Sequence, residues 1–259
     1  MARVLITGTR GGIGLDTAKR LLGLGHTVYA TVHQEGSVNK VKETLAPFGA
    51  LAIVEKLDVL EACDRDKALN WKIDILINNA AIGDSGPLAE IPVAKLKEVF
   101  ETNVFAVIAL SQVCIPYMKD QGAGKIIFLS SLVGLMPAYY MSPYSMTKYA
   151  IENVGLSFRK ELKPFGIDVT LINPGGYNTG FNQKNFAKKN NWFNTKGLYE
   201  KYLDKVYRVE KDISRFEHKS TASIAKQIVK AVSAKKMKRR YAAPWYQWFF
   251  VSLAKRFFV

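Results

Sequence analysis

Short runs of apolar residues alternate along the first 175 residues with longer segments in which apolar positions recur every three or four residues. The short runs predict strands at residues 4–7, 27–32, 51–57, 73–78, 125–130, 167–172 and 240–243. The longer segments predict helices near residues 13–24, 37–46, 60–70, 92–119 and 143–163. Because the strands are apolar at successive positions, they suit a parallel sheet that is covered on both faces. We therefore expect one doubly wound α/β domain.

The alternation stops after residue 175, so residues 1–175 form the predicted α/β core. Residues 176–219 form a long polar stretch that is punctuated by aromatic side chains. Insertions of this length are commonly lids or binding loops, so we expect a helical substrate lid. The alternative interpretation is a pair of surface helices whose aromatic side chains pack down. Residues 220–243 then supply the last helix and strand.

Residues 244–259 form an apolar and basic C-terminal tail. Apolar side chains recur there with the spacing of one helical face, at Tyr246, Phe249, Phe250, Leu253 and Phe257. Aromatic side chains beside a cluster of lysines and arginines are typical of helices that lie at a membrane surface. Packing of this amphipathic tail on its own domain or on a neighbouring subunit explains the pattern equally well, and the sequence leaves both interpretations open.

Glycines at positions 8, 12 and 14 follow the first predicted strand, and Ile13 opens the first predicted helix. Glycines allow the backbone to turn tightly and to approach a pyrophosphate closely. The free N–H groups and the positive dipole end of the helix attract that anion. Since the turn lies between a strand and a helix, it predicts a dinucleotide site built on Gly8, Gly12, Ile13 and Gly14.

The end of the second strand indicates which dinucleotide binds. NAD sites commonly place an acidic residue there, about twenty residues after the glycine turn. Here the strand ends at Val32 and His33, and Glu35 falls beyond it. Arg10 and His33 are instead suited to contact a 2′-phosphate. The sequence favours NADP(H) over NAD(H), which stays the alternative.

Tyr144 and Lys148 are four residues apart in a predicted helix, so both side chains lie on one face. A tyrosine hydroxyl transfers protons poorly at neutral pH, because its usual pKa is about 10. A neighbouring ammonium favours the phenolate and lowers that pKa. Ser131 follows the fifth strand, at the edge where α/β sheets bind ligands, and its hydroxyl suits hydrogen bonding to a substrate carbonyl.

Together these motifs resemble the single-domain form of the short-chain dehydrogenase/reductase family, which has about 250 residues. The resemblance is close over residues 1–180 and loose over residues 220–243. Ala81 stands where the family usually has glycine after Asn-Asn-Ala, a mild change beside the cofactor. The motifs that carry the resemblance are Thr7-Gly8-x-x-x-Gly12-Ile13-Gly14, Asp58-Val59, Asn78-Asn79-Ala80, Asn103, Ser131, Tyr144-x-x-x-Lys148 and Pro174-Gly175 followed by Thr179.

The resemblance implies a role for each matched residue. Tyr144 is expected to be the acid/base, Lys148 to hold the nicotinamide ribose and lower the pKa of Tyr144, and Ser131 to polarise the substrate oxygen. Asn103 is expected to fix a water in a proton relay. The family also implies a Rossmann-like, three-layer αβα fold around a seven-stranded parallel sheet with the strand order 3-2-1-4-5-6-7. Residues 1–175 are thus the predicted cofactor-binding and catalytic core. Its cofactor contacts fall on Asp58 and Val59 at the adenine, Asn79 and Ala80 beneath the cofactor, and Pro174, Gly175 and Thr179 at the nicotinamide end.

The substrate pocket is expected to be apolar and aromatic. Such a lining suits a lipophilic ketone or secondary alcohol better than a sugar. We therefore expect an oxidoreductase that transfers a hydride between nicotinamide and such a substrate. A different hypothesis is a cofactor-binding scaffold or redox sensor that works through its basic tail at a membrane or partner. The expected pocket residues are Ile82, Leu132, Leu135, Met136, Tyr139, Met141, Tyr177, Phe181 and Phe186.

Charge is concentrated in the last third of the chain. The formal net charge is +15, of which residues 181–259 carry nearly all. An anionic surface or ligand is therefore a plausible partner of this region, whereas the chain has no recognised nucleic-acid motif, so nucleic acid is not expected. Two cysteines rule out a disulfide framework, and the three histidines lack metal-ligand spacing, so no metal is expected. We expect a cytoplasmic homodimer or homotetramer, with the tail as the point of any peripheral membrane contact.

Overall fold

The computed structural model describes residues 1–258, and the side chains of residues 1–254. All the strands pair in parallel, in the order β3-β2-β1-β4-β5-β6-β7. This Rossmann-like sheet confirms the predicted fold and strand order. The strands are β1 (Arg3–Ile6), β2 (Thr27–Val32), β3 (Ala52–Lys56), β4 (Ile75–Asn78), β5 (Gly124–Leu129), β6 (Ile167–Pro174) and β7 (Arg240–Ala243).

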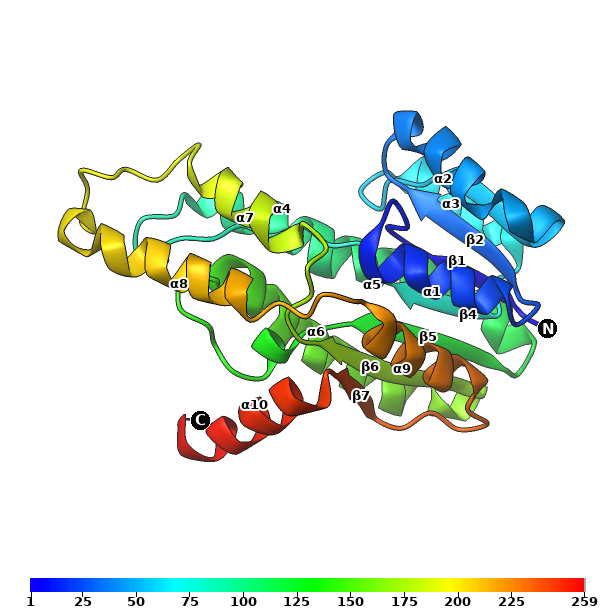
Figure 1. Cartoon of the computed structure of the whole chain (residues 1–259). Coiled ribbons are helices and arrows are strands. Elements are labelled where there is room, and N and C mark those ends of the chain that lie inside the picture. Colours follow the sequence, from blue (N-terminus) through cyan, green and yellow to red (C-terminus); the bar gives the residue numbers. More distant parts are fainter. Residues whose placement is uncertain (259) are drawn as a thin grey trace.

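Helices cover both faces of the sheet and form the outer layers (Figure 1). One face packs against α1 (Gly12–Leu22), α2 (Val38–Leu45) and α9 (Ala222–Ser233). The other packs against α3 (Ala62–Trp71), α5 (Ala106–Asp120) and α6 (Ser142–Glu161).

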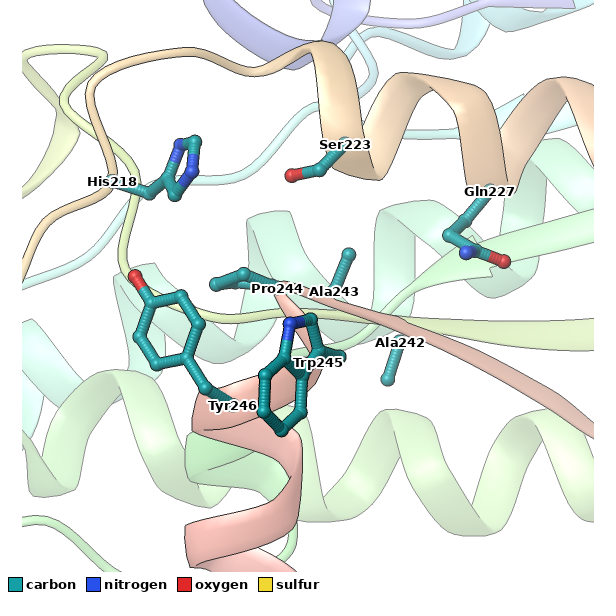
Figure 2. A pocket seen from close by; sticks show the side chains of 8 residues that line it. All are labelled: His218, Ser223, Gln227, Ala242, Ala243, Pro244, Trp245 and Tyr246. Carbon is teal, nitrogen blue, oxygen red and sulfur yellow. The ribbon is translucent and has the colours of Figure 1, made fainter.

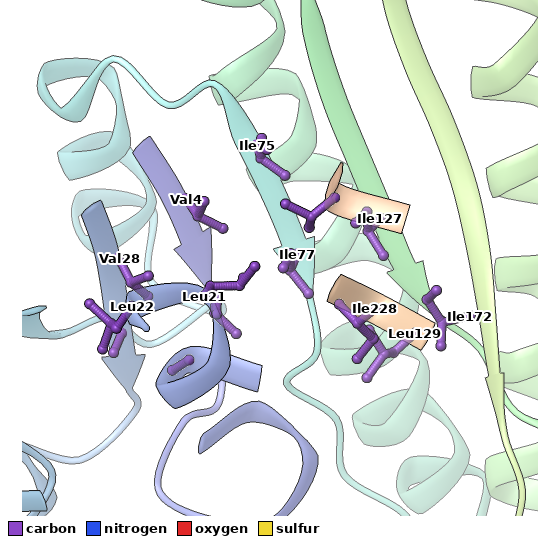
Figure 3. Packing of buried hydrophobic residues seen from close by; sticks show 14 of the residues in the cluster. Val4, Leu21, Leu22, Val28, Ile75, Ile77, Ile127, Leu129, Ile172 and Ile228 are labelled. Atoms are coloured by element: carbon purple, nitrogen blue, oxygen red, sulfur yellow. The ribbon is translucent and has the colours of Figure 1, made fainter. Parts of the chain in front are cut away.

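Successive residues of each strand point into opposite layers. In β1, Val4 and Ile6 belong to the α1 side of the core, whereas Leu5 belongs to the α5 side. Figure 3 shows strand side chains of the first layer packed against Leu21 of α1 and Ile228 of α9. Burial on both faces explains why the strands read as continuous apolar runs.

The predicted helix over residues 92–119 is interrupted. It consists of α4 (Val93–Phe100), a π-helical turn over Glu101–Phe105 and α5. A single wider turn hardly changes the hydrophobic periodicity, so the interruption could not be predicted from the sequence. The run from Val93 to Asp120 is also long and apolar enough to cross a membrane, but half of its most apolar window is buried in the domain. That burial is typical of a core helix.

Residues 176–219 lie outside the sheet and carry α7 (Phe181–Lys189) and α8 (Leu203–Arg215). The two ends of this segment lie side by side, because Tyr177 and His218 form an isolated β-bridge. The His218 N–H donates to the Gly176 carbonyl at 2.8 Å, and the Asn178 N–H donates to the His218 carbonyl at 3.0 Å. The segment is thus joined to the domain through a narrow, hydrogen-bonded base.

The tail forms α10 (Trp245–Phe258), which leaves the end of β7 below α8 in Figure 1. Gln247 binds both ends of the lid segment: its Oε1 accepts from the Gly176 N–H, and its Nε2 donates to the Phe216 carbonyl, each at 2.9 Å. On the opposite side α10 presents exposed Trp245, Phe249, Phe250 and Leu253. Tyr246 of the predicted stripe is half-buried, and the side chain of Phe257 lies outside the described residues.

Candidate active site

The glycine turn between β1 and α1 has the shape that an anion site needs. Gly8 and Gly12 adopt positive φ values of 74° and 58°, which side chains other than glycine rarely adopt. A Cβ on Gly8 would lie 2.9 Å from the Ala80 Cα. No described side chain caps the first turn of α1, so its N–H groups point free from the turn. The turn therefore fits the pyrophosphate of a dinucleotide.

Thr7 and Asn79 lock this turn to the end of β4. The Thr7 hydroxyl accepts from the N–H groups of Asn79 and Ala80 at 3.0 and 2.9 Å. The Asn79 amide in return donates to the carbonyls of Thr7 and Gly8 at 2.7 and 3.0 Å. These bonds cross the point between β1 and β4 where the strand order reverses, which is where doubly wound sheets bind nucleotides.

The adenine side of the turn is partly open. Arg10 and His33 are exposed, and Glu35 lies in a single 3-10 turn beyond the end of β2, as expected. Asp58 is half-buried and Val59 is buried after β3.

Asp64, which sequence reasoning missed, organises the Asp58 loop. Its Oδ2 accepts from the Asp58 N–H at 2.8 Å, and it forms ion pairs with Lys56 and Lys67. Burial opposes ionisation of Asp64, but its hydrogen bonds with the two lysines and the Asp58 N–H outweigh burial and lower its pKa to about 2. Its only sequence signal is a charged residue in the first turn of α3.

The predicted catalytic side chains meet between α6 and the end of β5. The Ser131 hydroxyl lies near enough to the Tyr144 hydroxyl to lower its pKa, and it lies 3.4 Å from the Pro174 carbonyl. Lys148 is buried, with its Nζ 5.4 Å from the centre of the Tyr144 ring. The Lys148 ammonium donates to the Leu129 carbonyl at 2.7 Å.

The pKa of Tyr144 is raised, whereas the sequence predicts that Lys148 lowers it. Burial is the main cause, and the hydrogen bond with Ser131 opposes it only in part. Burial also lowers the pKa of Lys148 to about 8, while the carboxylate of Glu152 raises it. The phenol is consequently protonated at neutral pH in this structure.

Asn103 lies in the π-helical turn, a feature that often marks functional sites. Its Oδ1 accepts from the Ile82 N–H at 2.9 Å, and its Nδ2 donates to the Ile82 carbonyl at 2.8 Å. The same Nδ2 contacts the Thr147 hydroxyl at 3.0 Å. Asn103 thus ties the loop after β4 to α6, one residue away from Lys148. Its expected role in a water relay stays a prediction.

Residues 176–219, the predicted lid, contact these residues and the glycine turn. The Phe181 ring, at the start of α7, lies 5.1 Å from the Tyr144 ring. A Cβ on Gly12 would lie 3.0 Å from the Thr179 Cγ2, so Thr179 sits against the glycine turn. The Trp192 indole N–H donates to Asp84 on the loop after β4 at 3.1 Å. Gly175 follows β6 and donates its N–H to the Ala243 carbonyl at 2.8 Å.

The side chains that were expected to line the substrate pocket differ in burial. Leu132, Leu135 and Met141 are buried beside the catalytic residues, whereas Tyr139 is 75% exposed. Tyr177 does not line the pocket, which corrects the prediction. It packs into the α9 side of the core and hydrogen-bonds to Ser223 at 2.7 Å, because the chain turns toward α9 at the base of the lid.

A hollow of about 270 Å³ lies on that α9 side of the lid base (Figure 2). Side chains from α9, the end of β7 and α10 surround it, and Ser223 of its lining hydrogen-bonds to Tyr177. No group of three or more His, Cys, Asp or Glu side chains within residues 1–258 is arranged to hold a metal ion. The hollow is lined by His218, Ser223, Gln227, Ala242, Ala243, Pro244, Trp245 and Tyr246.

The profile of the short chain dehydrogenase family matches residues 2–190. The chain belongs to this family. It is similar to 3-ketodihydrosphingosine reductase of Bacteroides thetaiotaomicron, with 32% identity over 215 residues, 83% of this chain and 76% of that protein. It is also similar to human retinol dehydrogenase 8, with 32% identity over 193 residues, 71% of this chain and 62% of that protein.

Solved structures share the whole fold. A short-chain dehydrogenase/reductase from Burkholderia phymatum in complex with NAD matches with a TM-score of 0.82 and 22% identity, over 97% of this chain and 92% of that one. A short-chain dehydrogenase from Sphingobium yanoikuyae in complex with NADPH matches with a TM-score of 0.75 and 20% identity, over 99% and 94%. The protein is therefore an oxidoreductase of this family, and the scaffold hypothesis is not favoured.

Proposed function

We propose that the protein is an NADP-preferring carbonyl reductase or alcohol dehydrogenase that acts on a lipophilic ketone or secondary alcohol. The observation that carries the proposal is the meeting of Tyr144, Ser131 and Lys148 beneath Phe181 of the lid. An acid/base hydroxyl, a second hydroxyl and an ammonium converge there, next to the glycine turn.

The positions of Tyr144, Ser131 and Lys148 suit the reduction of a carbonyl group. When bound at the glycine turn, the reduced cofactor supplies a hydride to the carbonyl carbon. Ser131 donates a hydrogen bond to the carbonyl oxygen and stabilises its developing negative charge. Tyr144, whose phenol is protonated at neutral pH, donates the proton that completes the alcohol, and the ammonium of Lys148 must favour the phenolate for this transfer to be efficient. Lys148 holds the ribose hydroxyls and balances the phenolate that remains, and oxidation of an alcohol runs the same steps backward.

The preference for NADP(H) is supported by the side chains around the adenine side. Arg10 and His33 are exposed at the turn and at the end of β2, where a 2′-phosphate would bind. Glu35 lies beyond the strand end and does not occupy that position. Comparing kcat/KM for NADPH and NADH tests this part of the proposal, and a higher value for NADH overturns it.

The lipophilic substrate is supported by the apolar residues beside Tyr144 and by the two relatives, whose names specify a long-chain sphingoid ketone and a retinoid. A panel of long-chain ketones, steroid ketones, retinal and keto-sugars, with NADPH consumption as readout, tests it. We expect kcat/KM to rise with apolar chain length. Turnover restricted to the sugars would contradict the proposal.

A homo-oligomer is supported by an exposed apolar face over α4 to α6. Phe105, Met146 and Tyr149 are exposed on this face. Phe100 and Leu96 line a shallow hollow beside Phe105. We propose that a second copy of the chain covers this face. Light scattering should give a dimer or tetramer mass, which Phe105→Lys lowers to that of a monomer. An unchanged mass in the variant places the interface elsewhere.

Peripheral contact of a cytoplasmic protein with an anionic membrane is supported by the exposed face of α10 and the basic last third of the chain. Flotation with vesicles that contain anionic lipid tests this contact. We expect the protein to float with anionic vesicles and to lose binding when Trp245, Phe249, Phe250 and Leu253 are all replaced by serine. Equal recovery of both proteins with the vesicles would refute the contact.

A further inference from the structure

A buried ionic cluster lies directly behind the catalytic residues and was not predicted from the sequence. Glu152 of α6, only 7% exposed, pairs through Oε2 with Nη2 of Arg240 on β7. Its Oε1 accepts from the fully buried Asn173 amide of β6 at 2.6 Å. We call these three residues the Glu152 cluster. Burial of a carboxylate is costly unless partners compensate it, and here one cation and one amide do so.

The Glu152 cluster contacts the catalytic residues along two routes. The Asn173 amide that binds Glu152 also donates to the backbone carbonyl of Ser131 at 3.0 Å. Glu152 itself follows Lys148 by one helical turn, on the same face of α6. Burial disfavours the charged form of Lys148, and the negative charge of Glu152 opposes that effect.

We propose that Glu152 is a positioning residue for catalysis: it holds Asn173 beneath Ser131 and supplies the negative charge that faces Lys148. The proposal rests on the proposed function, since it assigns Glu152 to the same hydride-transfer site. A glutamine at this position could still accept from Asn173, so the hydrogen bond alone does not require an acid. A carboxylate is required at this position because two cations, Lys148 and Arg240, lie around it.

Those charges come from two of the elements around Glu152. Lys148 faces it from its own helix, and Arg240 faces it from β7. Asn173 of β6 is uncharged. From α10, Trp248 adds a ring whose centre is 6.0 Å from the Arg240 guanidinium carbon. Arg240 thus forms an ion pair with the carboxylate and Lys148 is influenced by its charge, so removal of the carboxylate takes away a negative charge that favours both cations.

The Glu152→Gln variant tests the charge. In the wild type, affinity for NADPH, followed by its fluorescence, should fall as the pH rises through about 8, because Lys148 then loses the proton that binds the ribose. In the variant this midpoint should move about one pH unit lower. NADPH affinity at pH 6 should stay within about threefold of the wild type, because Lys148 is charged in both proteins at that pH.

Three further variants separate positioning from folding. Glu161→Gln removes an exposed carboxylate from the end of the same helix and should leave the pH midpoint unchanged. Glu152→Gln combined with Arg240→Met removes both buried charges, so it should fold even where the single variant does not. Its midpoint should lie between those of Glu152→Gln and the wild type, because it also lacks the repelling charge of Arg240. Glu152→Asp keeps the negative charge, so its pH midpoint should lie between those of Glu152→Gln and the wild type.

The measurement of NADPH binding separates the test of Glu152 from the test of the proposed substrate. A lower melting temperature with an unchanged pH midpoint, in either Glu152→Gln protein, would show that Glu152 serves folding alone and would overturn the proposal. Because NADPH binding is measured without a substrate, failure of the ketone panel leaves this result interpretable. A wild type that does not bind NADPH at all would instead refute the proposed function.

Discussion

Replacing Gly14 by alanine should destabilise the glycine turn, although alanine has a higher helix propensity than glycine. The added Cβ would lie 2.6 Å from the Asn79 Nδ2 and 2.6 Å from the Gly8 carbonyl oxygen. Asn79 uses that nitrogen for both of its hydrogen bonds to the turn. Loss of two bonds at about 1 kcal/mol each, together with about 1–3 kcal/mol of overpacking, exceeds the gain of about 1 kcal/mol in helix propensity.

The expected net loss is about 2–4 kcal/mol, which corresponds to about 5–15 °C in melting temperature for a chain of this size. Differential scanning fluorimetry of the cofactor-free protein measures it. Gly11→Ala is the matched control, because its Cβ meets no described atom within 4 Å and its extended backbone accepts any residue. The control should melt within about 2–3 °C of the wild type. If Gly14→Ala melts together with Gly11→Ala, Asn79 does not brace the turn.

Three further predictions concern other parts of the domain. Asp64→Asn should lower the free energy of unfolding by about 2 kcal/mol at pH 7, measured by urea unfolding. Because the pKa of Asp64 is lowered from 3.8 to about 2, the difference in stability between variant and wild type should shrink as the pH falls through that interval. A constant difference would refute the ion-pair explanation. Arg10→Ala should raise KM for NADPH about tenfold and leave KM for NADH unchanged, whereas equal effects on both would refute the phosphate contact. Gln247→Ala should speed hydrogen exchange of the Gly176 amide about tenfold, and an unchanged rate would show that α10 does not hold the lid base.

Much of the fold could be predicted because both faces of the sheet are buried. Residues 27–32 and 240–243 are strands with the predicted bounds, since the first ends where its apolar run ends and the second ends before Pro244. The glycine turn and the Tyr144–Lys148 pair are local patterns, and their spacing is visible in one segment of chain. The structure indeed places Lys148 beside the Tyr144 ring.

Contacts between residues far apart in the sequence could not be predicted from local patterns. Glu152 meets Asn173 and Arg240 across 21 and 88 residues of sequence, and no local pattern pairs them. The π-helical turn around Asn103 leaves the apolar spacing almost unchanged. Tyr177 looked like a pocket residue because it follows β6, but the direction of the chain at the lid base turns it into the core. The sign of the Tyr144 pKa shift depends on burial, which the sequence does not reveal.

The central claim is that Tyr144 completes a hydride transfer from nicotinamide to a lipophilic carbonyl. The direct measurement uses NADPH deuterated at the reactive carbon of its nicotinamide, a long-chain ketone and mass spectrometry of the product. The wild type should form an alcohol with one deuterium on the former carbonyl carbon. Tyr144→Phe should still bind NADPH but form this alcohol at least about a hundredfold more slowly. Deuterated alcohol formed equally fast by the variant, or no deuterium transfer by the wild type to any ketone, would contradict the claim.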